Sequence, residues 1–302
     1  MATRSPKGSM ELASDIKDPH SGPCDAITTL RFLKWQDLYL REKPFQLFCP
    51  LSDLDAARSN LAFEERSGVV INDARGKESE FDLDKQGFAF TNLEVDSSVF
   101  SNASSITETY LPKVKSLIQE KLKDVLEIRI FDWQIRRTWT TESGIIDGHD
   151  KSQHLLPSSH VHLDQDATNV PRMIRRHFPE KPESVMKRRV RIINVWKPLV
   201  DTVNDHPLAI CDGSTIADSD LVAADHITRG HFDINCYGLF SERHIWWYLN
   251  RQRQNEAILF KNFDADETVL AKHCLHTSFL QYPENTQNPS RESIEVRALV
   301  VS

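Results

Sequence analysis

The chain has 302 residues, of which 39% are hydrophobic and 27% are charged, so it can bury a sizeable core and is not a disordered chain. Its 37 Lys and Arg residues against 44 Asp and Glu residues give a net charge of −7. This balance argues against general nucleic-acid binding, which needs a positive field. No apolar run approaches the roughly 20 residues that span a bilayer, and no apolar stretch follows the first basic residues. We therefore expect a cytoplasmic protein without nucleic-acid or membrane partners.

The cysteine pattern supports the same compartment. The five cysteines are scattered, odd in number and never in a Cys-x-x-Cys pair: Cys24, Cys49, Cys211, Cys236 and Cys274. Such a pattern favours free thiols in a reducing compartment over a disulfide framework or a cysteine zinc site.

The N-terminal half mixes an arm, strands and a helix. Residues 1–26 are polar and without periodicity, so we expect a flexible arm. A β-branched run predicts a strand over 68–72, and helical spacing of apolar residues predicts an amphipathic helix over 110–125. A further strand is expected over 126–135, with Ile128, Ile130 and Asp132 on one side.

The C-terminal half has the texture of a β-protein. One short helix is expected over 169–178, and turn residues separate eight predicted strands, at 158–164, 190–198, 207–212, 232–240, 244–249, 256–263, 275–281 and 291–301. This favours a mainly β fold with flanking helices, built as an antiparallel barrel or jelly roll. We expect one domain over 27–302, with an N-terminal layer over 27–157 and the jelly-roll core over 158–302.

The first constellation is His160-Val-His162-Leu-Asp164. Residues two apart on a strand share a face, so His160, His162 and Asp164 are expected to project together. Two histidines and one carboxylate hold non-haem Fe(II) in many oxygenases. His276 is the best-placed distant histidine, because a basic strand follows it.

That basic strand, 291–301, predicts an anion site. Alternation places Arg291, Ser293, Glu295 and Arg297 on one face. Burying an unpaired guanidinium is costly, and arginine makes a two-pronged contact with a carboxylate. A dicarboxylic cosubstrate bound to the metal by one end would place its other carboxylate there.

The His-x-acid pattern alone does not choose the site. With 12 His and 44 acidic residues such triplets arise by chance, and the chain contains two, His162-Leu-Asp164 and His231-Phe-Asp233. The run from His160 is also similar to the His-x-His-x-Asp-His motif of metallo-β-lactamase-like hydrolases, although Gln165 replaces the last histidine. A zinc hydrolase using His160, His162 and Asp164 is therefore one alternative, and a non-catalytic cupin-like binding protein is another.

The stretch from His162 to the C-terminus resembles a fungal and bacterial family of iron- and 2-oxoglutarate-dependent hydroxylases and desaturases, related to aspergillic-acid hydroxylases and cephem-methoxylase-like proteins. The resemblance is carried by the motifs His162–Gln165, Ile192–Leu199, Pro207–Asp212, Trp246–Leu249, Glu256–Lys261, His276–Phe279 and Arg291–Leu299. Looser matches extend it upstream to about residue 27.

The resemblance implies a double-stranded β-helix oxygenase that uses Fe(II), 2-oxoglutarate and O2, with ascorbate as the reductant in vitro. It assigns iron to His162, Asp164 and His276, and the distal cosubstrate carboxylate to Arg291 and Ser293. Arg297 is the competitor for that role, and a salt bridge to Glu292 or Glu295 is the alternative for Arg291.

The resemblance also implies a secondary metabolite or an amino-acid-derived small molecule as substrate, which is hydroxylated, desaturated or cyclised. Asn194 is expected near the cosubstrate, and the substrate candidates are Arg136, Trp196 and His160. We expect the segment 141–158 to form part of a lid. The basic residues Arg172, Arg175, Arg176, Lys187, Arg188, Arg189 and Arg191 are interpreted as a solvated face. The sequence leaves the oligomeric state open, with a homodimer as one alternative.

Overall fold

The computed structural model describes residues 24–48, 58–138, 151, 154–228, 231–281 and 291–302. Residues 1–23 of the predicted arm and most of the predicted lid over 141–158 lie outside these residues, as does Cys49, whereas Ala26 at the end of the predicted arm already belongs to strand β1. The four cysteines that are described are free thiols, as expected from their spacing.

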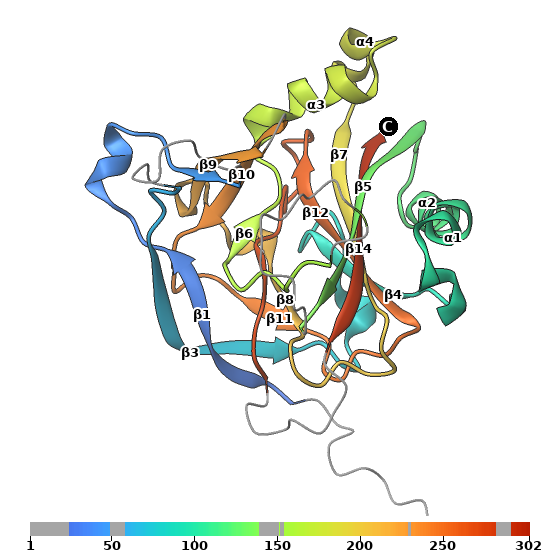
Figure 1. Ribbon diagram of the computed structural model, residues 1–302, viewed down its shortest axis with the longest axis horizontal. Helices are drawn as coiled ribbons and strands as arrows, with labels where there is room; N and C mark the ends of the chain where they lie inside the picture. Colours follow the sequence, from blue (N-terminus) through green and yellow to red (C-terminus); the bar gives the residue numbers. More distant parts are fainter. Residues whose placement is uncertain (1–23, 49–57, 139–150, 152–153, 229–230, 282–290) are drawn as a thin grey trace, which may run out of the picture.

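Two sheets face one another and form the predicted jelly roll (Figure 1). The nine-stranded sheet has the spatial order β1 (Ala26–Leu33), β3 (Phe63–Asp73), β11 (Trp246–Tyr248), β8 (Leu208–Cys211), β13 (His276–Ser278), β6 (His162–Leu163), β10 (His231–Gly238), β9 (Leu221–Thr228) and β2 (Phe45–Leu47). The five-stranded sheet has the order β4 (Phe88–Asn92), β12 (Glu256–Asp264), β7 (Val190–Pro198), β14 (Glu292–Val301) and β5 (Glu127–Arg137). Strands from before residue 158 thus extend both sheets.

The helices lie outside the sheets. They are α1 (Ala103–Ser105), α2 (Leu111–Lys121), α3 (Val170–His177) and α4 (Pro182–Met186), with a π-helical turn over Ile106–Tyr110. The described residues also form short 3-10 helical turns, at Asp37–Leu40, Glu78–Glu80, Ser97–Ser101, Ala167–Asn169, Gly213–Thr215 and Asp218–Asp220.

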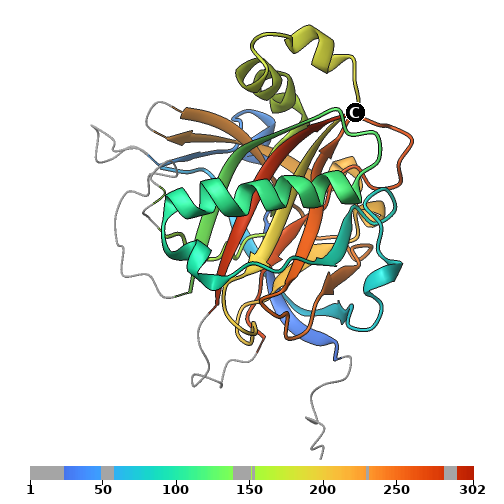
Figure 2. The same cartoon turned by 90° about the vertical axis from the view of Figure 1, so that its right-hand side faces the viewer.

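Helix α2 covers the outer face of the five-stranded sheet, across β5, β14, β7 and β12 (Figure 2). Its apolar stripe, Val114, Leu117 and Ile118, packs in one cluster with Val195 of β7 and Val296 of β14. This is the predicted amphipathic helix, but it is shorter than 110–125. It ends at Lys121 because the next residue, Leu122, adopts an extended conformation.

The interior between the sheets changes from apolar to polar along its length. At one end, Trp196 and Phe260 of the five-stranded sheet pack with Leu208 and Ile210 of the nine-stranded sheet. Toward the other end, β14 turns Ser293, Glu295 and Arg297 inward, while Ile294 and its alternate neighbours join the outer cluster under α2. The predicted alternation of β14 is therefore confirmed.

A β-bulge corrects one expectation. We expected Ile128, Ile130 and Asp132 on one side, but Asp132 pairs with Arg297 whereas Ile130 pairs with Ala298. Phe131 is thus an extra residue on β5, and it reverses the alternation at this point. As a result Ile128 and Ile130 join the outer cluster, and Asp132 lines the interior pocket.

Several further elements were not predicted, among them strands β1, β2 and β4. Strand β9 was not predicted, because its Ala-Ala-Asp centre has low strand propensity, and its pairing with β10 and β2 overrides that preference. Helix α4 was also not predicted. It packs through Val185 against the same apolar cluster as α3, beyond the end of β7 (Figure 1).

Candidate metal centre and pocket

The three residues predicted to bind the metal lie close together, two from one segment and one from a distant part of the chain. Asp164 follows β6, whose first residue is His162, and His276 begins the adjacent strand β13 directly opposite His162. One ligand atom from each lies within 4.8 Å of the others. Nε2 of His162 and Nε2 of His276 each lie 3.7 Å from an Asp164 oxygen.

The backbone orients both imidazoles toward this point. Nδ1 of His162 lies 2.8 Å from the carbonyl oxygen of His160, and Nδ1 of His276 lies 3.3 Å from that of Cys274. Each Nδ1 therefore carries the proton and donates it, which leaves Nε2 with a free lone pair. Nε2 of His276 is buried and has no hydrogen-bond partner among the described residues. A divalent cation is the partner that such a set of atoms fits.

Electrostatics keep the two kinds of ligand in their metal-binding forms. Burial, and then the neighbouring His276, lowers the pKa of His162 to about 3, so its imidazole is neutral. Burial alone would raise the pKa of Asp164, but the charge of Arg297 holds it well below its usual range. Neutral imidazoles beside an ionised carboxylate are the forms that coordinate a metal.

Asp164 is held by three side chains. Asn194 on β7 donates from Nδ2 to Oδ2 at 2.6 Å, and Arg297 donates from Nη2 to Oδ1 at 2.9 Å. The backbone N–H of Asp164 donates to Oδ1 of Asn262 at 2.9 Å. Asn194, which is expected near the cosubstrate, contacts the metal-site carboxylate and Glu295.

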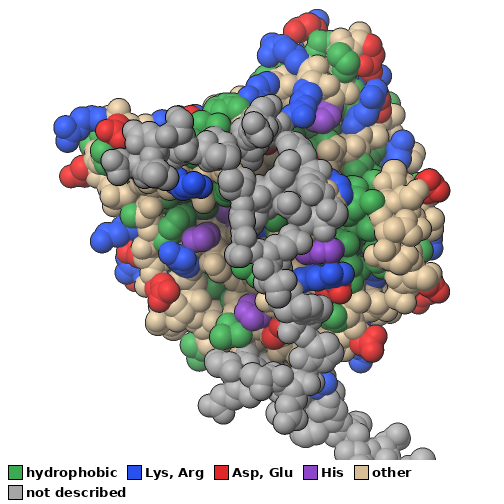
Figure 3. All heavy atoms as spheres, viewed as in Figure 1, with side chains coloured by type: hydrophobic (Ala, Val, Ile, Leu, Met, Phe, Trp, Pro, Cys, Tyr) green, Lys and Arg blue, Asp and Glu red, His purple; other side chains and the backbone are tan. Residues whose placement is uncertain are grey.

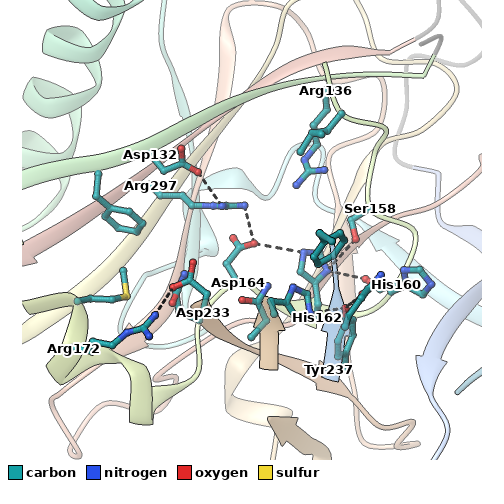
Figure 4. Close-up of a pocket in the computed structure, with 18 of the residues that line it drawn as sticks. Asp132, Arg136, Ser158, His160, His162, Asp164, Arg172, Asp233, Tyr237 and Arg297 are labelled. Carbon is teal, nitrogen blue, oxygen red and sulfur yellow. Dashed lines mark hydrogen bonds and ion pairs between the residues drawn. The ribbon is translucent and has the colours of Figure 1, made fainter. Parts of the chain in front are cut away.

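Arg297 is fully engaged with carboxylates. Besides Asp164, it donates to Glu295 at 3.0 Å and to Asp132 at 3.1 Å, as Figure 4 shows for Asp132 and Asp164. An anion that approached Arg297 would therefore compete with these three carboxylates.

Arg291 has the opposite environment. Its guanidinium is buried and donates to neutral oxygens only: to Ser293 at 3.2 Å, to Ser278 at 3.0 Å and to the carbonyl of His206 at 2.9 Å. It also lies over the ring of Trp196, 5.0 Å from the centroid. No carboxylate of the described residues lies within ion-pair distance of this guanidinium: Glu292 pairs with Arg137, Glu295 pairs with Arg297, and Asp205 accepts from the backbone N–H of Arg291. Burial lowers the pKa of Arg291 to about 9, because no carboxylate in contact with the guanidinium offsets its loss of solvation.

A cavity of about 490 Å³ opens beside the three residues. Its lining includes Asp132, Arg136, His160, His162, Asp164, Tyr237 and Arg297, drawn in Figure 4, together with apolar residues of α3 and of the segment before β6. Its volume suits a small organic molecule.

The substrate candidates have different positions. Arg136 and His160 line the cavity, whereas Trp196 is buried under Arg291. His160 precedes β6, lines the same cavity as His162 and packs its ring on Phe63, with the ring centroids 4.1 Å apart. Of the second triplet, Asp233 lines the cavity and binds Arg172 at 3.3 Å.

The basic residues around α3 and α4 are mostly exposed, and Figure 3 shows Lys and Arg side chains gathered there. Two members depart from the predicted solvated face. Arg189 binds Asp84 and Asp264, and Arg191 is buried.

Sequence reasoning missed several residues around the site. Ser278, which accepts from Arg291, lies two residues after His276, so strand alternation offered a signal for it. Asn262 and Asp132 offered none, because their positions depend on pairing between distant strands and on the bulge at Phe131.

The comparisons agree on the kind of protein. A family model described as oxidoreductase/YMDC permease-like domain matches residues 30–301. The chain is 30% identical to the alpha-ketoglutarate-dependent dioxygenase tstK of Talaromyces stipitatus, over 78% of this chain and 85% of that protein. It is 27% identical to the hydroxylase/desaturase efuI of Hormonema carpetanum, over 77% of this chain and 82% of that protein.

A solved structure has the same fold. The iron and alpha-ketoglutarate-dependent endoperoxidase NvfI superposes with a TM-score of 0.80 at 26% identity, covering 93% of this chain and 98% of that one. Across the described part of the chain, we find no helix with the length and apolar character needed to cross a membrane.

Proposed function

The chain belongs to this oxidoreductase family, and we propose that it is an Fe(II)/2-oxoglutarate-dependent dioxygenase that oxidises a small molecule of secondary metabolism. The observation that carries the proposal is the buried, unpartnered Nε2 of His276 beside His162 and Asp164. When bound, Fe(II) with 2-oxoglutarate and O2 supplies the oxidation of a C–H bond, with release of succinate and CO2.

His162, Asp164 and His276 are proposed to hold the iron on one face and to leave the remaining positions to small ligands. Their support is rigid: two imidazoles are oriented by backbone carbonyls, and the carboxylate by Asn194 and Arg297. These contacts fix the direction of each ligand atom before a metal arrives.

Arg291 and Ser293 are proposed to hold the distal carboxylate of 2-oxoglutarate, with Ser278 orienting the guanidinium. Arg291 is preferred to Arg297 because a carboxylate bound there would replace no existing ion pair. An anion beside Arg291 would also offset the cost of burying its charge.

The cavity is proposed to bind the substrate and to exclude bulk water from the reacting atoms. Hydroxylation, desaturation and ring formation all begin with removal of a hydrogen atom, so the residues around the site do not choose between them. The free thiols support a reducing, cytoplasmic location.

Succinate formation tests this function. Purified protein is supplied with Fe(II), ascorbate, 2-oxoglutarate and O2, with and without a small-molecule library. We expect O2-dependent succinate formation, which is lost in His162→Ala and in Arg291→Met. The matched control is Arg137→Met, which removes a cation that binds Glu292. A protein that binds 2-oxoglutarate but never forms succinate would instead be a cupin-like binding protein, and substrate turnover without O2 would indicate a hydrolase.

A further inference from the structure

Arg136 differs from two other arginines that line the cavity, Arg297 and Arg172. Arg297 contacts three carboxylates, and Arg172 contacts Asp233. Arg136 makes a single hydrogen bond, from Nη1 to the carbonyl oxygen of Leu156 at 2.9 Å, and among the described residues no carboxylate lies within 4.0 Å of it. In Figure 4 its guanidinium points into the pocket.

The fold places this cation there rigidly. Arg136 lies opposite Ser293 in the pairing of β5 with β14, so both side chains point to the interior. Its pKa is lowered, first by burial and then by Arg297, with only partial compensation from the nearby acids. A guanidinium held in a strand, half-buried and with most of its donors unused, binds a planar anion with little loss of entropy.

Arg136 is a neighbour of the proposed cosubstrate anchor, close enough for its charge to lower the pKa of Arg291, but the two guanidiniums have different surroundings. Arg136 lines the cavity, whereas Arg291 lies outside the cavity wall, on the ring of Trp196. The cavity around Arg136 also has apolar walls, including Leu155, Leu156 and Phe131. The site therefore combines a guanidinium that has no carboxylate partner among the described residues with an apolar surface.

We propose that Arg136 binds a carboxylate of the substrate, so that the substrate class is an organic acid with an apolar body, oriented at the metal by this one ion pair. The assignment rests on the proposed oxygenase function, because it places the acid in the cavity beside bound iron and 2-oxoglutarate.

A pair of probes that differ only in charge tests it. The protein is loaded with Zn(II), which supports no turnover, and saturated with 2-oxoglutarate so that Arg291 is occupied. Binding of 4-fluorobenzoate and of neutral 4-fluorobenzamide is then measured by ¹⁹F NMR. We expect the wild type to bind the acid at least about tenfold more tightly, as a charge-assisted hydrogen bond implies. Arg136→Met should abolish this preference and Arg136→Lys should reduce it, whereas Arg137→Met should retain it.

A second readout separates this proposal from the function on which it rests. The visible charge-transfer band of the Fe(II)–2-oxoglutarate complex, measured without O2, should appear in the wild type and remain in Arg136→Met, which also shows that this variant is folded. Equal binding of the two probes to the wild type, including no measurable binding of either, would overturn the proposal. So would a preference that survives in Arg136→Met, or loss of the band in that variant, which would assign Arg136 to the cosubstrate. Absence of the band from the wild type would contradict the oxygenase function itself, and the substrate assignment would fall with it.

Discussion

Arg297 donates a hydrogen bond of 2.9 Å from Nη2 to Oδ1 of Asp164, and the same guanidinium binds Glu295 and Asp132. Asn194 holds the other oxygen of Asp164 at 2.6 Å. The carboxylate between the two histidines is thus fixed from both sides, while the guanidinium of Arg291, six residues earlier on the same face, has no carboxylate of the described residues within ion-pair distance. Asp205 accepts from the backbone N–H of Arg291 instead. This contrast predicts that the two arginines serve different ligands.

Substituting Arg297 should weaken the metal site. Arg297→Met leaves Glu295 and Asp164 buried without their cation, so we expect iron affinity to fall roughly 10- to 100-fold and stability to fall by about 3–5 kcal/mol. Arg291→Met should leave iron affinity near that of the wild type and weaken 2-oxoglutarate binding. Calorimetric titrations with Fe(II) and with 2-oxoglutarate measure both effects. If Arg297→Met instead weakens only 2-oxoglutarate binding, the two roles are exchanged.

The hydroxyl of Ser278 should support cosubstrate binding indirectly. It accepts a hydrogen bond of 3.0 Å from Nη1 of Arg291. Ser278→Ala removes one contact that orients the guanidinium, so we expect 2-oxoglutarate affinity to fall by roughly three- to tenfold, with iron affinity unchanged. The control is Ser184→Ala on exposed α4. Unchanged 2-oxoglutarate affinity in Ser278→Ala would show that Arg291 needs no such support.

Gly238 should link packing to the metal site. A Cβ at this position would lie 2.7 Å from Cγ1 of Val161 and 2.9 Å from Cδ1 of Leu275, the residues that precede His162 and His276. Gly238→Ala should therefore push these segments apart, lowering stability by about 1–3 kcal/mol and weakening iron binding severalfold. Adding Val161→Ala should restore part of the lost stability and part of the lost iron affinity. Urea unfolding and iron titration measure these two quantities. Wild-type iron affinity in the Gly238→Ala variant would refute this link.

Acid should destabilise the fold through its buried histidines. Burial lowers the pKa of His226 to about 4, below the value near 6.5 of an unfolded chain. Between these values the unfolded chain binds more protons, so the contribution of neutral His226 is complete above about pH 6.5 and is lost as the pH falls toward 4. The slope is at most about 1.4 kcal/mol per pH unit for one such group. Urea unfolding at pH 7, 6 and 5 should show this loss, and His226→Gln should show a shallower one; identical slopes would contradict it.

Much of the site could be predicted because strand alternation is local. Because residues two apart on a strand share a face, His162 could be grouped with Asp164, and Arg291 with Ser293. The family resemblance added His276 to the metal ligands. These expectations agree with the positions of the residues, since each pair lies on one short segment.

What could not be predicted depends on contacts between distant segments. Whether Arg291 or Arg297 is free of carboxylates is decided by the pairing of β14 with β5, where the bulge at Phe131 brings Asp132 to Arg297. The ring of His160 packs on Phe63 of β3, which is also a contact between distant segments. Neither contact has a signature in the local sequence.

The most direct test is an anaerobic titration of the wild-type protein with Fe(II) in the presence of 2-oxoglutarate, followed by its visible charge-transfer band and compared with His276→Ala. The account predicts saturation at one Fe(II) per chain for the wild type and no band for the variant. A wild-type protein that binds no iron, or a His276→Ala variant that binds it equally well, would contradict the account.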